Sequence, residues 1–201
     1  RNGDYVVNMV VDEIARMGIK GLTLFPSALF PVHEPLIEHI KSGVIKNIQG
    51  SMNGPVGRFV SYGGLPSVAV LRTHGGRVRA VEDGDVHIDV AFIAAPSSDD
   101  YGNANGVDGP SACGPLAYSA IDWQYADKVV VITDNLLPYP LVPFSVPATH
   151  VDYVVKVDQI GDPGLIVSGT TRITRSPTRL KIAQMAAQFI NCLLYTSDAA
   201  D

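Results

Sequence analysis

Carboxylates, amides and glycines are concentrated in residues 99–106, which read Asp-Asp-Tyr-Gly-Asn-Ala-Asn-Gly. They follow an apolar run, residues 88–94, that is typical of a strand buried on both faces in the middle of a parallel sheet. Ligands of open α/β sheets bind outside the carboxyl ends of the strands, so we expect a binding site here. Because adjacent carboxylates point in different directions, one of Asp99 and Asp100 would bind a ligand, while the other would cap a helix or close an Asx turn. A loop that only closes turns explains these residues equally well.

A second cluster, Gly50-Ser-Met-Asn-Gly-Pro-Val-Gly57, follows another predicted strand, residues 44–48. Its three glycines allow the backbone to approach a ligand closely and to present amide groups to a phosphate or to a developing oxyanion. The spacing matches neither a P-loop nor a dinucleotide-binding fingerprint. A tight turn without a ligand accounts for the cluster about as well.

A third cluster, Thr73-His-Gly-Gly-Arg77, also comes directly after an apolar run, residues 68–71. His74, Gly75 and Gly76 could hold a thioester or a carboxylate, and the alternative is a Gly-Gly turn with solvated side chains. His87 stands at the beginning of the strand over residues 88–94, away from the carboxyl ends, and we interpret it as a structural residue.

Three arginines, Arg172, Arg175 and Arg179, lie in Gly-Thr-Thr-Arg-Ile-Thr-Arg-Ser-Pro-Thr-Arg, residues 169–179. Guanidinium groups suit a polycarboxylate, because each can make paired hydrogen bonds to one carboxylate. The alternative is a polar entrance to the helix that follows.

The elements that would position these clusters alternate between helix and strand. Apolar spacing predicts helices over residues 4–17, from Pro35 to Gly43, and from Ser176-Pro177 onward, where Leu180, Ile182, Ala183, Met185, Ala186 and Phe189 would form an apolar interior packed on the sheet or on a missing domain. Short apolar runs predict strands over residues 22–25, 44–48, 68–71, 88–94, 129–133 and 151–157. Four prolines predict an extended crossing over residues 136–147. We therefore expect an α/β fold with a mostly parallel sheet flanked by helices, whose carboxyl edge gathers the clusters into one pocket.

Composition limits the function classes. The chain has 201 residues, 46% of them hydrophobic, which suffices for one sizeable core. A net charge of −5 without a basic cluster argues against nucleic acid as a partner, and no apolar run is long enough to span a membrane. Two cysteines, Cys113 and Cys192, lack metal-ligand spacing and indicate a reducing cytoplasm, and we predict no metal site. From Cys192 onward the helical pattern is lost, so we assign residues 1–191 to the domain and residues 192–201 to a non-native tail.

Five segments, taken in order, resemble the alpha subunit of bacterial citrate lyase: residues 50–57, 74–77, 85–96, 99–106 and 168–175. The resemblance runs from Asp4 to Phe189. A strand followed by an acidic residue and Tyr-Gly-Asn is shared more loosely with CoA-transferases in general, whereas the order of the segments is specific to the citrate lyase alpha chain.

The resemblance implies a CoA-transferase-like (NagB/RpiA-like) α/β fold and a transferase activity. In that family an acetyl thioester on the acyl carrier, or gamma, subunit is exchanged for a citryl thioester with release of acetate. The beta subunit then cleaves the citryl thioester to oxaloacetate. The prosthetic group, a phosphoribosyl-dephospho-CoA, belongs to the carrier, so the resemblance implies no cofactor bound by this chain. The exchange passes through a mixed anhydride without a glutamyl thioester on the protein.

Under that mechanism the protein need only align the reactants and stabilise an oxyanion. The roles that follow are hypotheses. Ser51, Asn53 and Gly54 would act on the oxyanion. Thioester and substrate would be bound by Gly50, Gly57, His74, Gly75, Gly76, Asp99, Asn103, Asn105, Arg172 and Arg175, of which Asn103 and Asn105 hold the pantetheine arm or acyl group and the two arginines hold citrate.

This chain departs from the family in length, because the family's alpha subunit is considerably longer and has two related α/β halves. We therefore expect a partial subunit that is not active alone. Two other functions remain open, a sugar-phosphate isomerase or deaminase of related fold and a non-catalytic scaffold for the other lyase subunits.

Overall fold

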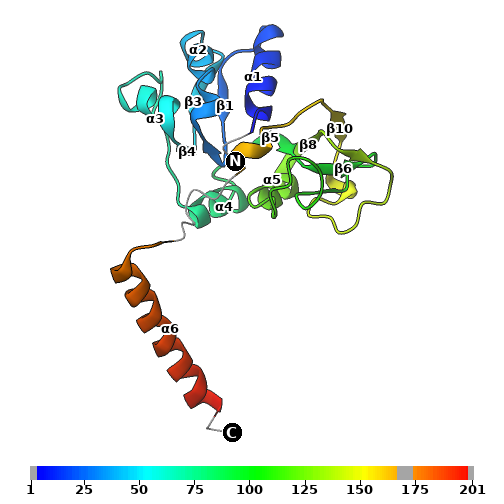
Figure 1. Ribbon diagram of the computed structural model, residues 1–201. Helices are drawn as coiled ribbons and strands as arrows, with labels where there is room; N and C mark the ends of the chain where they lie inside the picture. Colours follow the sequence, from blue (N-terminus) through cyan, green and yellow to red (C-terminus); the bar gives the residue numbers. More distant parts are fainter. Residues whose placement is uncertain (1–3, 167–173, 199–201) are drawn as a thin grey trace. The chain divides into compact units, whose positions relative to one another are not determined.

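Helices and strands alternate along the chain, as predicted (Figure 1). The helices are α1 (Val6–Arg16), α2 (Leu36–Lys41), α3 (Gly54–Ser61), α4 (His74–Glu82), α5 (Ser119–Tyr125) and α6 (Pro177–Asp198), with 3-10 turns η1 (Pro31–His33), η2 (Ala148–His150) and η3 (Pro163–Leu165). The strands are β1 (Leu22–Leu24), β2 (Ala28–Leu29), β3 (Ile45–Ile48), β4 (Ser51–Met52), β5 (Ile88–Ala94), β6 (Ser97–Asp99), β7 (Ala104–Asn105), β8 (Ala126–Thr133), β9 (Leu136–Leu137) and β10 (Tyr153–Lys156).

This computed structural model describes residues 4–166 and 174–198. The chain divides into two units, Arg1–Val167 and Ser168–Asp201, and each is described by itself. The first unit contains all the strands and the first five helices of the described residues.

Parallel pairing dominates the first unit. β5 pairs with β8 from Ile88↔Ala126 to Ala94↔Ile132, β8 pairs with β10, and β1 pairs with β3, all in parallel. β2–β4 and β6–β9 are also parallel, and β6–β7 is antiparallel. One core forms around β1 and β3 under α1, α2 and α3, and a second forms around β5 and β8. The predicted fold class is therefore confirmed, although the described strands form four hydrogen-bonded groups and not one continuous sheet.

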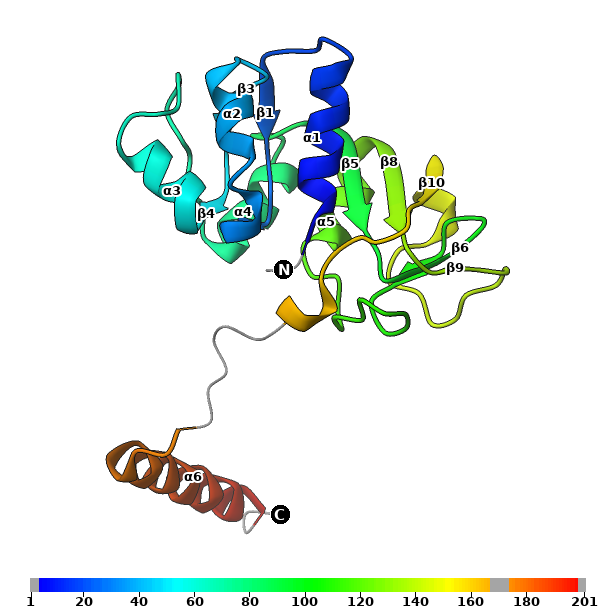
Figure 2. The same ribbon diagram turned by 45° about the horizontal axis from the view of Figure 1, so that its top comes forward.

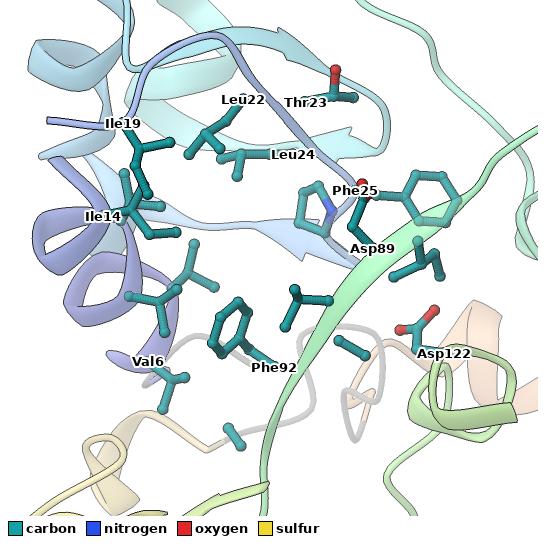
Figure 3. A pocket seen from close by; sticks show the side chains of 18 of the residues that line it. Val6, Ile14, Ile19, Leu22, Thr23, Leu24, Phe25, Asp89, Phe92 and Asp122 are labelled. Atoms are coloured by element: carbon teal, nitrogen blue, oxygen red, sulfur yellow. The ribbon is translucent and has the colours of Figure 1, made fainter. Parts of the chain in front are cut away.

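The prediction that residues 88–94 lie in the middle of the sheet is wrong. Among the described strands, β5 pairs with β8 alone, and Val90 and Phe92 are each 42% exposed. The other side of β5 borders a cavity of about 520 Å³ that lies between α1, β1 and β5. Figure 3 shows Val6 and Ile14 of α1 on one side of this cavity and Phe92 on another. An apolar run predicts a strand, but it does not show whether another strand, a helix or a cavity borders that strand.

Two other segments differ from prediction. Residues 68–71 form no strand, because only Val70 pairs, through an isolated bridge to Gln49. The proline-containing segment begins with a short strand, β9, before it becomes irregular. β9 pairs with β6 through Leu136 and Leu137.

The second unit contains α6, which begins at Pro177 as predicted. The helix runs to Asp198, so the expected loss of helix at Cys192 is wrong. The side chains expected to form a packed interior are exposed, from 51% at Leu180 to 66% at Phe189. No helix of the described residues is both long enough and apolar enough to cross a bilayer.

Candidate functional site

The carboxyl ends of the central strands share one edge of the first unit. Figure 2 shows β1, β5 and β8 running in the same direction, and β3 runs parallel to β1. Residues 50–57 follow β3 at this edge, and α4 begins at the same edge because Val70, just before it, bridges to Gln49 after β3. Residues 99–106 begin at the end of β6.

The glycines of residues 50–57 meet the protein's own backbone. A Cβ added at Gly50 would lie 2.4 Å from the carbonyl oxygen of Pro26, and one at Gly57 would lie 2.4 Å from that of Met52. Gly54 has a φ of +68° and packs against Pro31. These three glycines are therefore required for tight chain packing, whatever ligand the turn binds.

Ser51, Asn53 and Gly54 present the accessible part of this turn. All three are exposed, and Asn53 occupies the N-cap of α3 without a side-chain capping hydrogen bond. The first N–H groups of a helix have no partner within the helix and carry partial positive charge. The turn can therefore present amide groups and the Ser51 and Asn53 side chains to a negatively charged oxygen.

His74, Gly75 and Gly76 form the first turn of α4, so the Gly-Gly turn considered above is wrong. The Thr73 hydroxyl caps the helix by accepting a hydrogen bond from the Gly76 N–H at 3.0 Å. His74 is exposed and stacks on Tyr118 with ring centroids 5.7 Å apart. A Cβ added at Gly75 would have nothing within 4 Å, so this side of the helix start is open to a ligand.

These two clusters lie on either side of the end of β1. The Gly50 N–H donates to the Val70 carbonyl at 2.9 Å, and Gly50 packs on Pro26. From the α4 side, Arg77 donates to the carbonyl of Phe25 at 3.1 Å. The structure therefore brings residues 50–57 and residues 73–77 together around Phe25 and Pro26.

The Asp99 carboxylate is buried and accepts five hydrogen bonds from the protein. One oxygen accepts the backbone N–H groups of Tyr101, Gly102 and Asn103 at 2.8–3.0 Å. The other accepts the Leu141 N–H at 2.9 Å and the Asn103 side-chain amide at 2.8 Å. Burial, the largest influence, raises the pKa of Asp99, but the hydrogen bonds from Leu141, Asn103 and Tyr101 together outweigh it and hold the pKa below its usual value. Asp99 is thus the carboxylate that closes the Asx turn, while exposed Asp100 accepts the Tyr139 N–H.

Asn103 and Asn105 are buried and also bonded within the protein. The side-chain oxygen of Asn103 accepts the Ala148 N–H at 2.9 Å. The Asn105 amide donates to the Pro143 carbonyl at 2.7 Å, and its oxygen accepts the Val107 N–H at 3.0 Å. Together with Asp99, these side chains tie β6 and β7 to the proline-containing segment.

The loop that carries these residues lies apart from the other two clusters. In Figures 1 and 2, β6 lies on one side of α1 and β5, whereas β4 and α3 lie on the other. The cavity beside β5 is lined mostly by apolar residues of α1, β1 and β5 and includes none of the predicted site residues. The described residues therefore unite two of the clusters but not the third.

The arginines lie elsewhere. Arg172 is outside the described residues, and Arg175 is exposed in the second unit, just before α6. His87 is exposed at the beginning of β5 and pairs with Asp127 at 2.9 Å. With Asp89 these two make the one group within the described parts of the chain whose ligand atoms are close enough together to hold a metal ion.

Arg77 and His33 are buried polar residues to which local sequence patterns assign no role, and Asp122 is half-buried. Arg77 is paired with Asp122, and burial raises the pKa of Asp122 while Arg77 opposes the rise. His33 is buried at the end of η1, and loss of hydration lowers its pKa. The Thr73-His-Gly-Gly-Arg77 motif pointed at Arg77, but its partner lies 45 residues away and left no local signal.

Comparisons with known proteins agree on one family. The family model described as citrate lyase, alpha subunit (CitF), matches residues 1–200. The citrate lyase alpha chain of Escherichia coli (strain K12) is 47% identical over 191 residues, which are 94% of this chain and 38% of that protein. A solved structure from Streptococcus mutans, described as an alpha subunit of citrate lyase in complex with citrate, has 55% identity and a TM-score of 0.87 over 94% of this chain and 38% of that one.

A more distant likeness concerns the fold alone. Glutaconate coenzyme A-transferase from Acidaminococcus fermentans has a TM-score of 0.53 at 16% identity, covering 73% of this chain and 65% of that one. The chain thus has a CoA-transferase-like α/β fold and spans a little over a third of the length of the citrate lyase alpha chains that it matches.

Proposed function

The chain belongs to the family of citrate lyase alpha subunits, and from this membership we propose that it is part of a CoA-transferase that exchanges acetate for citrate on a thioester. The observation that carries the proposal is the pairing of two turns, residues 50–54 and 73–76, on either side of the end of β1. Both turns begin helices, α3 at Gly54 and α4 at His74, and the first N–H groups of a helix have no partner within the helix.

In the proposed reaction a carboxylate oxygen of citrate attacks the thioester carbonyl carbon. The new carbon–oxygen bond forms as the carbonyl becomes a tetrahedral oxyanion, and the carbon–sulfur bond then breaks to leave a mixed anhydride and a thiolate. The thiolate attacks the citryl carbonyl of the anhydride, and acetate leaves. The citrate carboxylate is itself the nucleophile, so the protein requires none of its own, and no proton is gained or lost over the exchange.

The residues have distinct proposed roles. Ser51, Asn53 and the amide of Gly54 stabilise the oxyanion, because they are the exposed donors of the first turn. His74 and the amide of Gly75 hold the thioester at the start of α4, and Gly76 supports the turn because its N–H donates to the Thr73 hydroxyl. Arg172 and Arg175 bind citrate. Asp99, Asn103 and Asn105 hold their own loop together through internal hydrogen bonds, which supports a structural role for them in place of contact with the acyl group.

The wider setting is proposed from the family. The thioester is carried by a phosphoribosyl-dephospho-CoA on the gamma subunit, so this chain has no cofactor of its own, and the beta subunit cleaves the product. The reaction takes place in the cytoplasm, without nucleic acid or a membrane as a partner.

The test uses the full-length alpha subunit incubated with acetyl-CoA and citrate, with products followed by mass spectrometry. We expect citryl-CoA and acetate in equal amounts. A parallel incubation with sugar phosphates distinguishes the isomerase or deaminase alternative. Absence of citryl-CoA, or conversion in the sugar-phosphate incubation alone, would overturn the proposal.

Citrate binding makes a separate prediction. Changing Arg172 to Ala removes a charged hydrogen-bond donor and should raise the KM for citrate about 10- to 100-fold, because such bonds contribute about 1.5–3 kcal/mol. The KM for acetyl-CoA should stay near its wild-type value. Lys181→Ala on α6 removes an exposed cation and serves as the control. An unchanged citrate requirement in Arg172→Ala would exclude that arginine from the site.

A further inference from the structure

Arg77 joins three elements through one buried side chain. It is 4% exposed, and its two terminal nitrogens donate to both oxygens of Asp122 on α5, at 2.9 and 3.0 Å. One of these nitrogens also donates to the carbonyl of Phe25, the residue that follows β1. A single guanidinium therefore fixes α4 to the end of β1 and to α5.

The same guanidinium contacts two aromatic rings. It lies 4.2 Å from the centroid of the Phe25 ring and 4.8 Å from that of Tyr118. Tyr118 in turn stacks on the imidazole of His74. Phe25, Arg77, Tyr118 and His74 thus form a continuous series of planar groups from the end of β1 to the first residue of α4.

The ion pair between Arg77 and Asp122 contributes less to stability than its hydrogen-bond geometry suggests. The Nε of Arg77 is buried without a hydrogen-bond partner, and burial raises the pKa of Asp122 despite the nearby guanidinium. Buried ion pairs can often be replaced by apolar side chains without loss of stability. A planar guanidinium, in contrast, fixes the orientation of the groups around it. Its paired hydrogen bonds and its ring stacking each favour one relative orientation.

We propose that Arg77 is a positioning residue that sets the orientation of His74 and of the first turn of α4 against the end of β1. The inference rests on the proposed thioester role of His74 and Gly75. Through Tyr118, Arg77 determines where the His74 ring lies, and through Phe25 it determines how far the turn of residues 73–76 stands from the turn of residues 50–54.

The first test is Arg77→Lys in the full-length subunit, which keeps the positive charge but replaces the planar guanidinium with an ammonium group. A misplaced thioester should lower kcat about 100-fold, whereas the KM for citrate should change less than about 3-fold, because other residues bind citrate. Arg79→Lys is the matched control: the same change on the same helix, at a side chain that is 81% exposed and paired with Asp83. It should leave kcat within about 2-fold of wild type. A kcat retained in Arg77→Lys would overturn the proposal.

A double variant separates positioning from folding. Arg77→Met with Asp122→Leu removes both buried charges and should fold, as judged by thermal unfolding, yet it should keep the loss of kcat. Wild-type kcat in this variant would show that catalysis does not need the planar guanidinium of Arg77.

The position of His74 gives a readout that does not require activity. In full-length subunit labelled with ¹³C at its histidines, the His74 imidazole signal, assigned with His74→Gln, should shift in Arg77→Lys because Tyr118 no longer holds the ring. An unshifted signal would contradict the inference. If wild-type subunit makes no citryl-CoA, the proposed function fails, whereas the His74 signal still tests the positioning role.

Discussion

Asp99→Ala should lower the free energy of unfolding by about 4–5 kcal/mol, among the largest effects expected of a point change. The substitution removes both oxygens of a buried carboxylate and leaves the N–H groups of Tyr101, Asn103 and Leu141 without their partner, while the Gly102 N–H keeps only the Asp99 backbone carbonyl. Denaturant unfolding followed by circular dichroism measures the loss. Asp100→Ala is the matched control, because that exposed neighbour accepts one hydrogen bond and should cost about 1 kcal/mol or less. Equal losses in the two variants would contradict this account.

The same carboxylate makes stability depend on pH. The pKa of Asp99 lies below its unfolded value of about 3.9, so the unfolded chain binds its proton at higher pH than the folded chain does. Its contribution is complete above pH 5 or so and is lost as the pH falls through the unfolded and then the folded pKa. The wild type should therefore lose stability between about pH 5 and pH 2 more steeply than Asp99→Ala does. Parallel acid titrations of the two proteins would contradict this sign.

Gly50→Ala should destabilise the protein by about 3 kcal/mol and should abolish exchange. The new Cβ would lie 2.4 Å from the carbonyl oxygen of Pro26, which is backbone and cannot rotate away. The turn would have to shift, breaking the 2.9 Å hydrogen bond from Gly50 to Val70 and separating the two turns that flank β1. Thermal unfolding and citryl-CoA formation measure the two effects.

Gly75→Ala is the stability control for this prediction. It adds the same methyl group, but nothing lies within 4 Å of it, and alanine favours the helix by up to about 1 kcal/mol over glycine. Thermal unfolding should therefore be unchanged or slightly raised. A Gly50→Ala protein as stable as Gly75→Ala would show that the turn adapts without cost.

Local patterns predicted most elements, because the residues that determine them are close in sequence. β5 matches the apolar run of residues 88–94, and α1 falls within the helix predicted over residues 4–17. α6 likewise begins where Ser176 and Pro177 indicate a helix start. The type of turn was also predictable, because an Asx turn was considered for one of the two adjacent carboxylates and Asp99 closes one.

Tertiary contacts were not predictable in the same way. The exposure of Val90 and Phe92 depends on which element borders β5, and no spacing within the strand records that neighbour. Asn103 and Asn105 were interpreted as ligand-binding residues, yet their partners, Ala148 and Pro143, come from a segment about 40 residues later. The Phe25–Arg77–Tyr118 contacts likewise join three distant segments.

Helix α6 exposes a large apolar surface to water. Five large apolar side chains, at Leu180, Ile182, Met185, Phe189 and Ile190, are each more than half exposed to water on one helix. A second copy that covered them would remove apolar surface from water, and such association would strengthen by mass action. The melting temperature of this 201-residue chain should therefore rise with its concentration, and dilution should be used to separate the intrinsic stability of the α/β unit from the contribution of self-association.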